Sequence, residues 1–494
     1  MRIQVLLASL IVVILTAPTL AQTEGSSAAT DRTQVEKELQ ELRAELEEMR
    51  QWRESVEATK AAPEKDNTRE MPEVITEEMV TAHEEGDGRE PRIQLPRSMS
   101  LRISGEHRTR FEYKDSVYSP ADPMGMETFD YTHMRNRLRF DFDVAEDVTA
   151  VFEAQDVRTW GEEGSTTADA EGLDLKRGFI KVDSLIGDDI SGQLGRFVMH
   201  YGDQRLIGHL EWVDQGRTFD GFRLSYTPDD DTYVDLFGTR IRDDAIGVVD
   251  EQDFVGIYAG INEITPGLSA EGYGLLLLDQ MKAAGEVGVG NTGFVTVGTR
   301  LFGNSGAIDY SGELAYQNGD VRDDDLSAYA FAAKAGYTLE DNDWNPRFGV
   351  EVAYASGDDD PTDGDNGTFQ TLFPTNHMHY GYADLVAWSN IINFRGSISV
   401  QPADRVQVAI DYHHFQLADE NGGWFNAGGG LIRPGAAGAD DHLGDEIDLT
   451  VKWGITEEVM LQTGWSYFLA GDFVSDTGDD PDANFFYVQA GVKF

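Results

Sequence analysis

The feature that most constrains the fold of this chain is a strict alternation of apolar and polar residues, which is clearest at residues 484–494. The apolar positions of this stretch are Phe486, Val488, Ala490, Val492 and Phe494, and between them lie Tyr487, Gln489 and Lys493. A period of two places successive side chains on opposite faces of a β-strand. The stretch is therefore predicted to be a strand whose two faces meet two different environments.

The same alternation runs through the body of the chain, from Met99 to Phe494. We predict about eighteen strands, near 101–112, 133–144, 147–158, 172–184, 190–200, 219–227, 231–241, 251–260, 269–278, 291–303, 306–318, 325–339, 347–356, 388–401, 405–416, 443–453, 458–468 and 484–494. The pattern is ambiguous at 172–184 and 231–241, so the count holds to within two strands. An even number of strands, with one face toward lipid and the other toward a watery lumen, is typical of a transmembrane antiparallel β-barrel.

The predicted connections alternate between short and long. The short ones lie around 145–146, 228–230, 304–305, 402–404 and 454–456, and the long ones are 114–128, 201–218, 357–387, 417–442 and 469–483. Outer-membrane barrels have short periplasmic turns at one end and longer extracellular loops at the other. A soluble sandwich or solenoid has no reason to follow this alternation, so the connections favour the barrel.

Three segments precede the predicted barrel. Residues 1–21 join Arg2 to an apolar run and are predicted to be a signal peptide that is cleaved after Ala21. Residues 31–58 carry apolar side chains three and four apart, which indicates a short periplasmic coiled coil that would hold a homo-oligomer together; a lone amphipathic helix is the alternative. Residues 59–98 are acidic and proline-containing, and we expect a disordered linker there.

The composition narrows the range of partners. A formal net charge of -50 argues against nucleic acid, because a phosphate backbone requires a basic surface. Many of the acids fall in the predicted outer loops, for example at 358–365, 440–441 and 479–482. The chain has no cysteine, so its fold must be held by other means, such as a closed ladder of backbone hydrogen bonds.

The polar parity of the predicted strands is rich in arginine. We expect it to line a pore with Arg102, Arg108, Arg110, Arg135, Arg137, Arg139, Arg223, Arg347, Arg395, Arg405 and Lys452. Arginine offers a planar fork of donors that suits carboxylates, and rows of basic side chains are how pores select anions. Arg135, Arg137 and Arg139 would form such a row on one strand. The alternative is that arginines paired with neighbouring acids only fill and stiffen the lumen.

A series of glycine- and arginine-containing motifs lies between residues 175 and 224. The motifs are Gly195-Arg196-Phe197, the runs 201–208 and 215–224, the pair Glu211-Trp212, and Leu175-Lys176-Arg177-Gly178-Phe179-Ile180 in the preceding strand. Together they resemble the alginate export family of outer-membrane barrels, over residues 100 to 494. The resemblance implies an eighteen-stranded barrel with an arginine-lined channel that passes an acidic polysaccharide of uronic acids, although many relatives would serve as general or substrate-specific porins.

The resemblance directs attention to the loop at 201–218. The loop contains Leu206, Ile207 and Leu210, which are too apolar to extend into water. We expect it to fold into the barrel mouth, where Arg205 and Arg217 would meet the solute beside Trp212. In the alternative, the loop packs on the rim with Arg205 paired to Asp203 or Glu211.

Other candidate sites are weaker. Residues 358–367 have oxygen ligands for calcium but lack the distal glutamate of an EF-hand, so a solvated acidic loop is favoured. The pairs His377/His379 and His413/His414 lack an obvious third ligand for a transition metal. No nucleophile motif marks a hydrolase.

The sequence therefore predicts a protein of the outer membrane, with its N-terminal segment in the periplasm and outer-membrane lipid around its barrel. We expect a passive channel for an anionic polysaccharide or oligosaccharide, with no enzymatic activity, metal or cofactor. A general or other-solute porin is one alternative, and a plugged structural or adhesive barrel is another.

Overall fold

The computed structural model describes residues 93–95, 99–163, 172–243, 250–340 and 342–494. The predicted signal peptide and coiled coil lie outside the described residues, as does the predicted linker except for 93–95. The last of these form part of a short strand, β1 (Ile93–Gln94), which pairs with the start of the first long strand.

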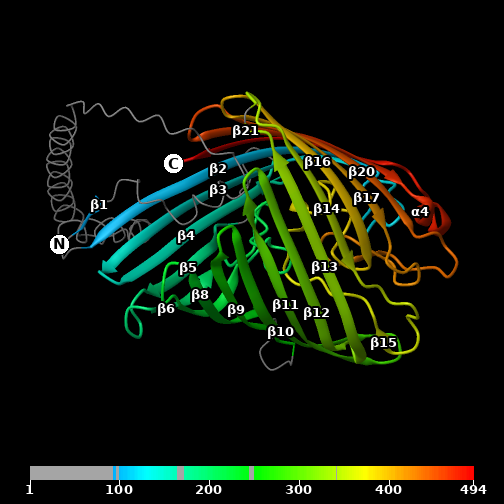
Figure 1. The fold of residues 1–494 in the computed structure, drawn as a ribbon, viewed down its shortest axis with the longest axis horizontal. Coiled ribbons are helices and arrows are strands. Elements are labelled where there is room, and N and C mark those ends of the chain that lie inside the picture. The colour runs from blue at the N-terminus through cyan, green and yellow to red at the C-terminus, as the bar shows by residue number, and fades with distance from the viewer. Residues whose placement is uncertain (1–92, 96–98, 164–171, 244–249, 341) are drawn as a thin grey trace, which may run out of the picture. The chain divides into compact units, whose positions relative to one another are not determined.

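Eighteen long strands make up the body of the protein (Figure 1). They are β2 (Ser100–Asp115), β3 (Thr128–Ala145), β4 (Val148–Thr159), β5 (Asp174–Val182), β6 (Ile190–Phe197), β7 (Phe219–Tyr226), β8 (Thr232–Arg242), β9 (Gln252–Thr265), β10 (Leu268–Ala284), β11 (Val289–Ser305), β12 (Ile308–Val321), β13 (Asp324–Thr338), β14 (Arg347–Ala355), β16 (Ile391–Ala403), β17 (Val406–Gln416), β20 (His442–Gly454), β21 (Val459–Ala470) and β22 (Ala483–Lys493). Each of the predicted strands corresponds to one of them, so the predicted fold class is confirmed.

The sheet closes on itself through its first and last long strands. β22 pairs antiparallel with β2, in a register that runs from Asp115 opposite Asn484 to Glu106 opposite Lys493. The ladder extends to Phe494, which exchanges two backbone hydrogen bonds with Gly105, at 2.8 and 3.0 Å. A closed barrel leaves no unpaired sheet edge, and every strand can satisfy its backbone groups without water.

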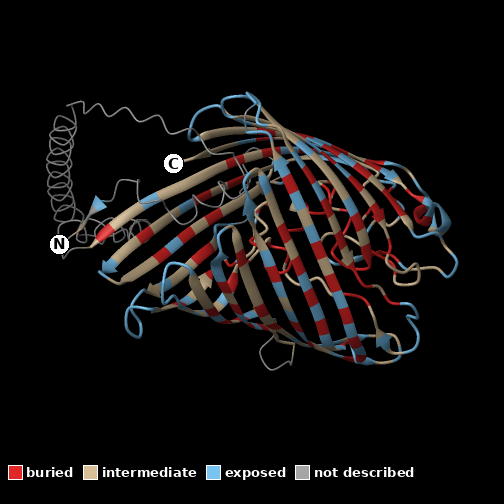
Figure 2. Cartoon of the chain, in the orientation of Figure 1, coloured by how far each residue is buried: buried red, intermediate tan, exposed pale blue. Residues whose placement is uncertain are grey.

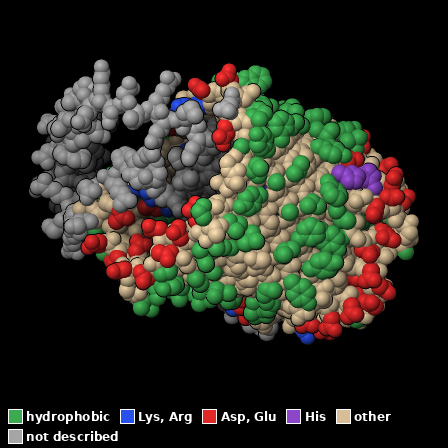
Figure 3. Space-filling model, viewed as in Figure 1, with side chains coloured by type: hydrophobic (Ala, Val, Ile, Leu, Met, Phe, Trp, Pro, Cys, Tyr) green, Lys and Arg blue, Asp and Glu red, His purple; other side chains and the backbone are tan. Residues whose placement is uncertain are grey.

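The two faces of the barrel differ as the alternation predicts. On β14, Phe348 and Val350 point outward with exposed fractions of 45 and 66 %, whereas Glu351 is buried on the inner face. Along β10 to β14 buried and exposed residues alternate as stripes (Figure 2). Apolar side chains cover the outer face of the strands, and acidic side chains gather at the rim near β15 (Asp365–Asn366) and α4 (Asp472–Thr477) (Figure 3). No helix in the described part of the chain is long and apolar enough to cross a membrane.

Short turns lie at one end of the barrel, here called the short-turn end, and the long loops lie at the other, the long-loop end. The short-turn connections are 146–147, 183–189, 227–231, 266–267, 306–307, 339–346, 404–405 and 455–458. The long loops are 116–127, 198–218, 356–390, 417–441 and 471–482. All five predicted long loops are present.

The predicted alternation of lengths is wrong at two places on the long-loop end, where the connections 285–288 and 322–323 are also short. Arg322 and Asp323 both have positive φ, 58° and 81°, which makes a tight two-residue hairpin. The 356–390 loop covers this low rim, because its β15 pairs in parallel with the first residues of β13. The long loop between β14 and β16 thus covers the part of the rim where the connections 285–288 and 322–323 are short.

Two of the long loops fold into the barrel and form an apolar core there. The 198–218 loop buries Met199, Leu206 and Ile207, and the 356–390 loop buries Phe369, Leu385 and Trp388. The two loops meet at a parallel bridge between Ile207 and Phe373. Burying a side chain of this size stabilises the docked loop by roughly 1.5–3 kcal/mol, which explains why such apolar segments leave the solvent. The 356–390 loop also contains the short helix η2 (Asn376–Met378), and the 417–441 loop contains the hairpin of β18 (Trp424–Phe425) and β19 (Leu431–Arg433).

Candidate functional site

The candidate site is a cationic wall that β2, β3 and β5 present to the lumen. Arg108 lies opposite Arg135 in the β2–β3 register, and Arg110 and Arg137 follow on the same inner face. All four are buried, as is Lys176 of β5. Five cationic groups this close repel one another, so they require nearby acids to remain charged in a buried place.

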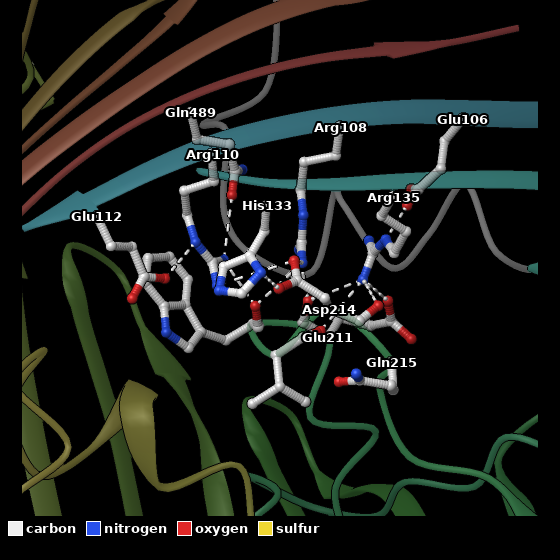
Figure 4. A network of polar contacts seen from close by, with 12 residues as sticks. Glu106, Arg108, Arg110, Glu112, His133, Arg135, Glu211, Asp214, Gln215 and Gln489 are labelled. Atoms are coloured by element: carbon white, nitrogen blue, oxygen red, sulfur yellow. Dashed lines mark hydrogen bonds and ion pairs between the residues drawn. The ribbon is translucent and has the colours of Figure 1, made fainter. Parts of the chain in front are cut away.

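The 198–218 loop brings two of these acids. Glu211 lies 2.5 Å from Arg137 Nη1, 3.0 Å from Arg135 Nη1 and 3.2 Å from Lys176 Nζ. Asp214 Oδ1 lies 2.6 Å from Arg108 Nη2 and 4.0 Å from Arg110 Nη2. Figure 4 shows the two carboxylates reaching up toward the arginines of β2 and β3. Burial by itself raises the pKa of Glu211, but Arg137, Lys176 and Arg135 hold it well below its ordinary value.

Backbone carbonyls of the same loop complete the coordination of the wall. Arg108 donates to the carbonyl of Glu211 at 2.7 Å, Arg110 to that of Trp212 at 2.7 Å, and Lys176 to that of Gln215 at 2.9 Å. Acids of the wall itself take further donors, for example Glu112, which lies 2.6 Å from Arg110 Nε, whereas Arg108 Nε is buried without a partner in the described part of the chain. The loop is therefore held by the wall through both its charges and its main chain.

Trp212 anchors the loop through its ring. The Arg110 guanidinium lies over this ring, 4.1 Å from the centroid. His377 stacks on Trp212 with a centroid distance of 3.9 Å, and Tyr487 of β22 meets it edge-on at 4.8 Å. An indole held on several sides in this way fixes the position of Glu211 beside it.

Arg205 and Arg217 are both bound by other parts of the protein. Arg205 Nη2 lies 2.7 Å from Glu351 Oε1, and its Nη1 donates to the Tyr380 hydroxyl at 2.9 Å. Burial opposes the charge of Arg205, but Glu351 and Tyr380 raise its pKa overall. Arg217 donates to the carbonyls of Gly208, Phe373 and Pro374, and burial lowers its pKa to about 10.

The 201–218 loop has the position that the sequence predicts, and a contact of Arg205 and Arg217 with the solute stays a prediction. The loop folds into the barrel, but Arg205 and Arg217 tie it to β14 and to the 356–390 loop. The alternative, in which Arg205 pairs with Asp203 or Glu211, is wrong, because Asp203 pairs with Arg300 and Lys334.

The other predicted pore residues divide by position. Arg102 and Arg139 both pair with Asp141, at 2.9 and 2.8 Å, and Arg395 pairs with Asp411 at 2.7 Å. Lys452 is half-buried on the inner parity of β20. Arg347, paired with Asp309, begins β14 directly after the 339–346 turn. Arg405 lies in the 404–405 turn and pairs with Glu457, so it belongs to the short-turn rim and not to the lumen wall.

Arg135, Arg137 and Arg139 do lie on one strand and one face, but they do not form a free row. The first two share Glu211, and the third is held by Asp141. From the sequence, Lys176 was predicted only as part of a motif, and Arg300 was not predicted. The partner roles of Glu211 and Asp214 were also missed, since nothing local to a loop specifies which strand its acids will reach.

A cavity of about 430 Å³ lies between β5, β6, β7 and β8 toward the short-turn end. Its lining residues are Lys181, Asp183, Asp188, Ser191, Arg223, Ser225, Thr227, Tyr233 and Asp235. Tyr201 of the 198–218 loop donates to Asp235 at 2.6 Å, and Arg223 donates to Gln193 at 2.9 Å. Of the predicted pore residues, Arg223 is therefore the one that lines this cavity.

Comparison with known proteins agrees with this architecture. The alginate export family model matches residues 99–488. No curated protein matches the chain. Similar solved structures come from Pseudomonas aeruginosa. OccK9 (OpdG) has a TM-score of 0.54 at 10 % identity, with 80 % of this chain and 98 % of that chain covered. OpdL has a TM-score of 0.52 at 14 % identity, with 80 % of this chain and 99 % of that chain covered. The outer membrane protein OprD has a TM-score of 0.52 at 11 % identity, with 80 % of this chain and 94 % of that chain covered.

At these identities the solved structures show a shared fold, whereas the family match covers most of the chain. The short-turn end of such a barrel faces the periplasm and the long-loop end faces outward. The chain belongs to the alginate export family, and its barrel is an outer-membrane channel.

Proposed function

We propose that this channel conducts acidic saccharides of the uronate class, as polymers or oligomers, by passive diffusion along the cationic wall. One observation carries the proposal: the wall already binds carboxylates. Arg108, Arg135, Arg137 and Lys176 hold Glu211 and Asp214 at 2.5–3.2 Å. Each uronate unit carries one carboxylate, which is the group that this wall is built to bind.

In this mechanism the carboxylates of the 198–218 loop occupy the place of the solute. When the loop moves away, the four cations lose Glu211 and Asp214, and carboxylates of an entering saccharide take over their contacts. The exchange replaces one carboxylate by another, so the cations are not left buried and unpaired. Conduction then requires several weak sites in series, since one tight site would stop transport.

A barrel that stays closed is the second candidate, and a specific observation favours it. The 198–218 loop is also held on its far side, where Arg205 pairs with Glu351 and Asp203 pairs with Arg300 at 2.5 Å. A loop fixed in this way on two walls would plug the lumen. The family and fold nevertheless point to a channel and not to an enzyme.

The test is the reversal potential of the purified protein in a planar bilayer under a salt gradient, followed by addition of uronate oligomers to one side. We expect anion-selective current that uronate oligomers block and neutral oligosaccharides of equal length do not. Cation selectivity would instead indicate a general porin governed by its acidic loops. Absence of current would indicate the plugged barrel.

Glu211→Gln sharpens the test. Removing one carboxylate charge from beside Arg137, Arg135 and Lys176 is expected to increase the anion selectivity and to strengthen block by uronate about tenfold. Glu457→Gln is the matched control, because Glu457 pairs with Arg405 at the exposed short-turn rim. If both variants conduct like the unmodified channel, the cationic wall does not select the solute.

A further inference from the structure

Three potential metal ligands meet on the outer surface of the barrel near the long-loop end. His414 Nδ1 lies 2.8 Å from Asp445 Oδ1, and His442 Nε2 lies 3.3 Å from Asp445 Oδ2. One ligand atom from each residue falls within 4.8 Å of the others, and this is the one such group among the described residues. We propose that His414, His442 and Asp445 bind a divalent transition-metal ion, with Zn²⁺ as its representative.

The pairing of β17 with β20 creates this group. His414 lies directly opposite Asp445, and a register shift between Phe415 and Gln416 brings His442 alongside. The two imidazole rings stack with a centroid distance of 5.0 Å. The 417–441 loop separates the histidines in sequence, so the sequence pair His413/His414 gave no third ligand.

The alternation of side chains along β17 also shows that His413 and His414, the pair suggested by the sequence, lie on opposite faces of the strand. Tyr412 and Ile410 share the parity of His414 and are exposed on the outer face, whereas His413 is buried on the lumen side, where it stacks on Phe415. Adjacent strand residues point to opposite faces, so His413 and His414 cannot share an ion. The partners of His414 lie across the strand pair instead.

The chemistry and spacing suit zinc. Imidazole nitrogen and carboxylate oxygen bind Zn²⁺ at about 2.0–2.1 Å, so two ligands of a tetrahedral ion lie roughly 3.3 Å apart. The distance between His442 Nε2 and Asp445 Oδ2 already has this value. His442 Nε2 is buried and makes no hydrogen bond in the described part of the chain. Water would complete the coordination as a fourth ligand.

A neighbouring hydroxyl orients the carboxylate, as supporting residues do in metal sites. Tyr412 donates to Asp445 Oδ1 at 2.6 Å. The ion would take the place of the hydrogen bond between His414 Nδ1 and Asp445 Oδ1, and the neutral imidazole of His414 would then carry its proton on Nε2. Asp440 and Asp476, linked by a 2.9 Å hydrogen bond, lie just before His442 and within the acidic rim, and their charge attracts cations. The histidines on this face border the acidic rim in Figure 3.

An ion bound at this site would affect the 417–441 loop. His414 lies near the end of β17 and His442 begins β20, so a bound ion would tie together the two ends of the 417–441 loop. This loop packs over the barrel mouth through Trp424, whose ring lies 5.0 Å from that of Tyr118. Bound metal is therefore expected to make the loop harder to open.

The experiment uses the full chain, folded in detergent, stripped with chelator and free of affinity tags. Zn²⁺ is titrated calorimetrically, and Co²⁺ is used as a probe whose visible absorption reports its coordination. We expect one ion per chain at this site. His442→Gln and Asp445→Asn should each weaken binding at least tenfold.

His107→Gln is the matched control. His107 lies on the outer parity of β2 and contacts Asn136 at 2.7 Å, and it belongs to no group of three potential metal ligands among the described residues. Heat-modifiable migration on gels checks that each variant is folded, and Asp445→Asn keeps the test valid if a histidine variant does not fold. Equal affinity and an unchanged Co²⁺ spectrum in His442→Gln and Asp445→Asn would overturn the proposal.

Discussion

Two stretches of the lumen wall receive the inward loops in different ways. On the wall of β2, β3 and β5, Glu211 and Asp214 form ion pairs with arginine and lysine. On β20, Glu446 and Asp448 are almost completely buried, and no lysine or arginine pairs with either in the described part of the chain. The 356–390 loop offers Glu446 only a backbone N–H, from Ala383 at 2.9 Å.

Each of these two loops is therefore matched to the charge of the wall it covers. An acidic loop lies on the basic wall, and a loop that supplies amide groups lies on the acidic wall. Gly381 permits the second contact: its φ is +86°, and a Cβ there would lie 2.4 Å from Glu446 Oε1. The basic wall therefore binds the 198–218 loop strongly through ion pairs. The acidic wall instead binds the 356–390 loop because the backbone of that loop, at Gly381 and Ala383, lies close to the Glu446 carboxyl group.

The largest effect on stability and anion selectivity is expected from removing arginines of the cationic wall. Arg135→Ala combined with Arg137→Ala leaves Glu211 buried with Lys176 as its remaining cation. Breaking a buried ion pair from one side costs about 3–5 kcal/mol, so the 198–218 loop should undock and anion selectivity should fall. Urea unfolding and the bilayer reversal potential measure the two consequences.

Arg196→Ala is the control for this pair of substitutions. Arg196 forms a 2.7 Å ion pair with the exposed Asp220, and such surface pairs contribute about 0–1 kcal/mol. A double variant as stable and as selective as Arg196→Ala would show that the ion pairs of Glu211 do not hold the loop.

An intermediate effect is expected from pH. His379 of the 356–390 loop is fully enclosed, and burial together with the nearby Arg205 lowers its pKa to about 3. An undocked His379 would return to an ordinary pKa of about 6.5. Because the docked pKa is the lower one, docking loses stability as the pH falls from about 6.5 toward 3, by up to ~1.4 kcal/mol per pH unit.

The fluorescence of the tryptophans and the open probability of the channel, followed from pH 7.5 to 4.5, measure this loss. His379→Gln should flatten the dependence attributable to this loop. Between pH 7.5 and 4.5 Glu211 does not contribute to this loss, because its docked pKa is held below its ordinary value of 4.5 and its stabilisation falls only below that value. An unchanged pH profile in His379→Gln would place the sensitivity elsewhere.

The smallest effect is expected on the acidic wall. Glu446 and Asp448 lie at alternate positions of β20, and Glu446 Oε2 and both carboxylate oxygens of Asp448 have no hydrogen-bond partner in the described part of the chain. Glu446→Gln would replace one carboxyl by an amide that can donate to Asp448, and it should stabilise the protein by about 1 kcal/mol. Urea unfolding compares it with Glu457→Gln at the exposed rim. A destabilised Glu446→Gln variant would mean that the two acids bind a cation, which would remove the contrast between the walls.

The strands and the closure of the barrel could be predicted because their signal is local. Alternation between positions such as Phe348, Val350 and Glu351 assigns each side chain to lipid or lumen without reference to any other strand. The same rule placed the arginines of β2 and β3 on the lumen face. It failed at Arg405, where the chain turns and the alternation no longer has meaning.

The tertiary structure decided which groups meet across the lumen and across strand pairs. Whether Arg137 is open to solute depends on Glu211, which lies on a loop after β6, and no periodicity relates the two. His414, Asp445 and His442 likewise meet only through the register of β17 and β20 and the bulge beside it. Local patterning thus determined the barrel, while the packing of distant loops determined which of its charges are neutralised, because docking depends on the summed burial and charge of segments far apart in the chain.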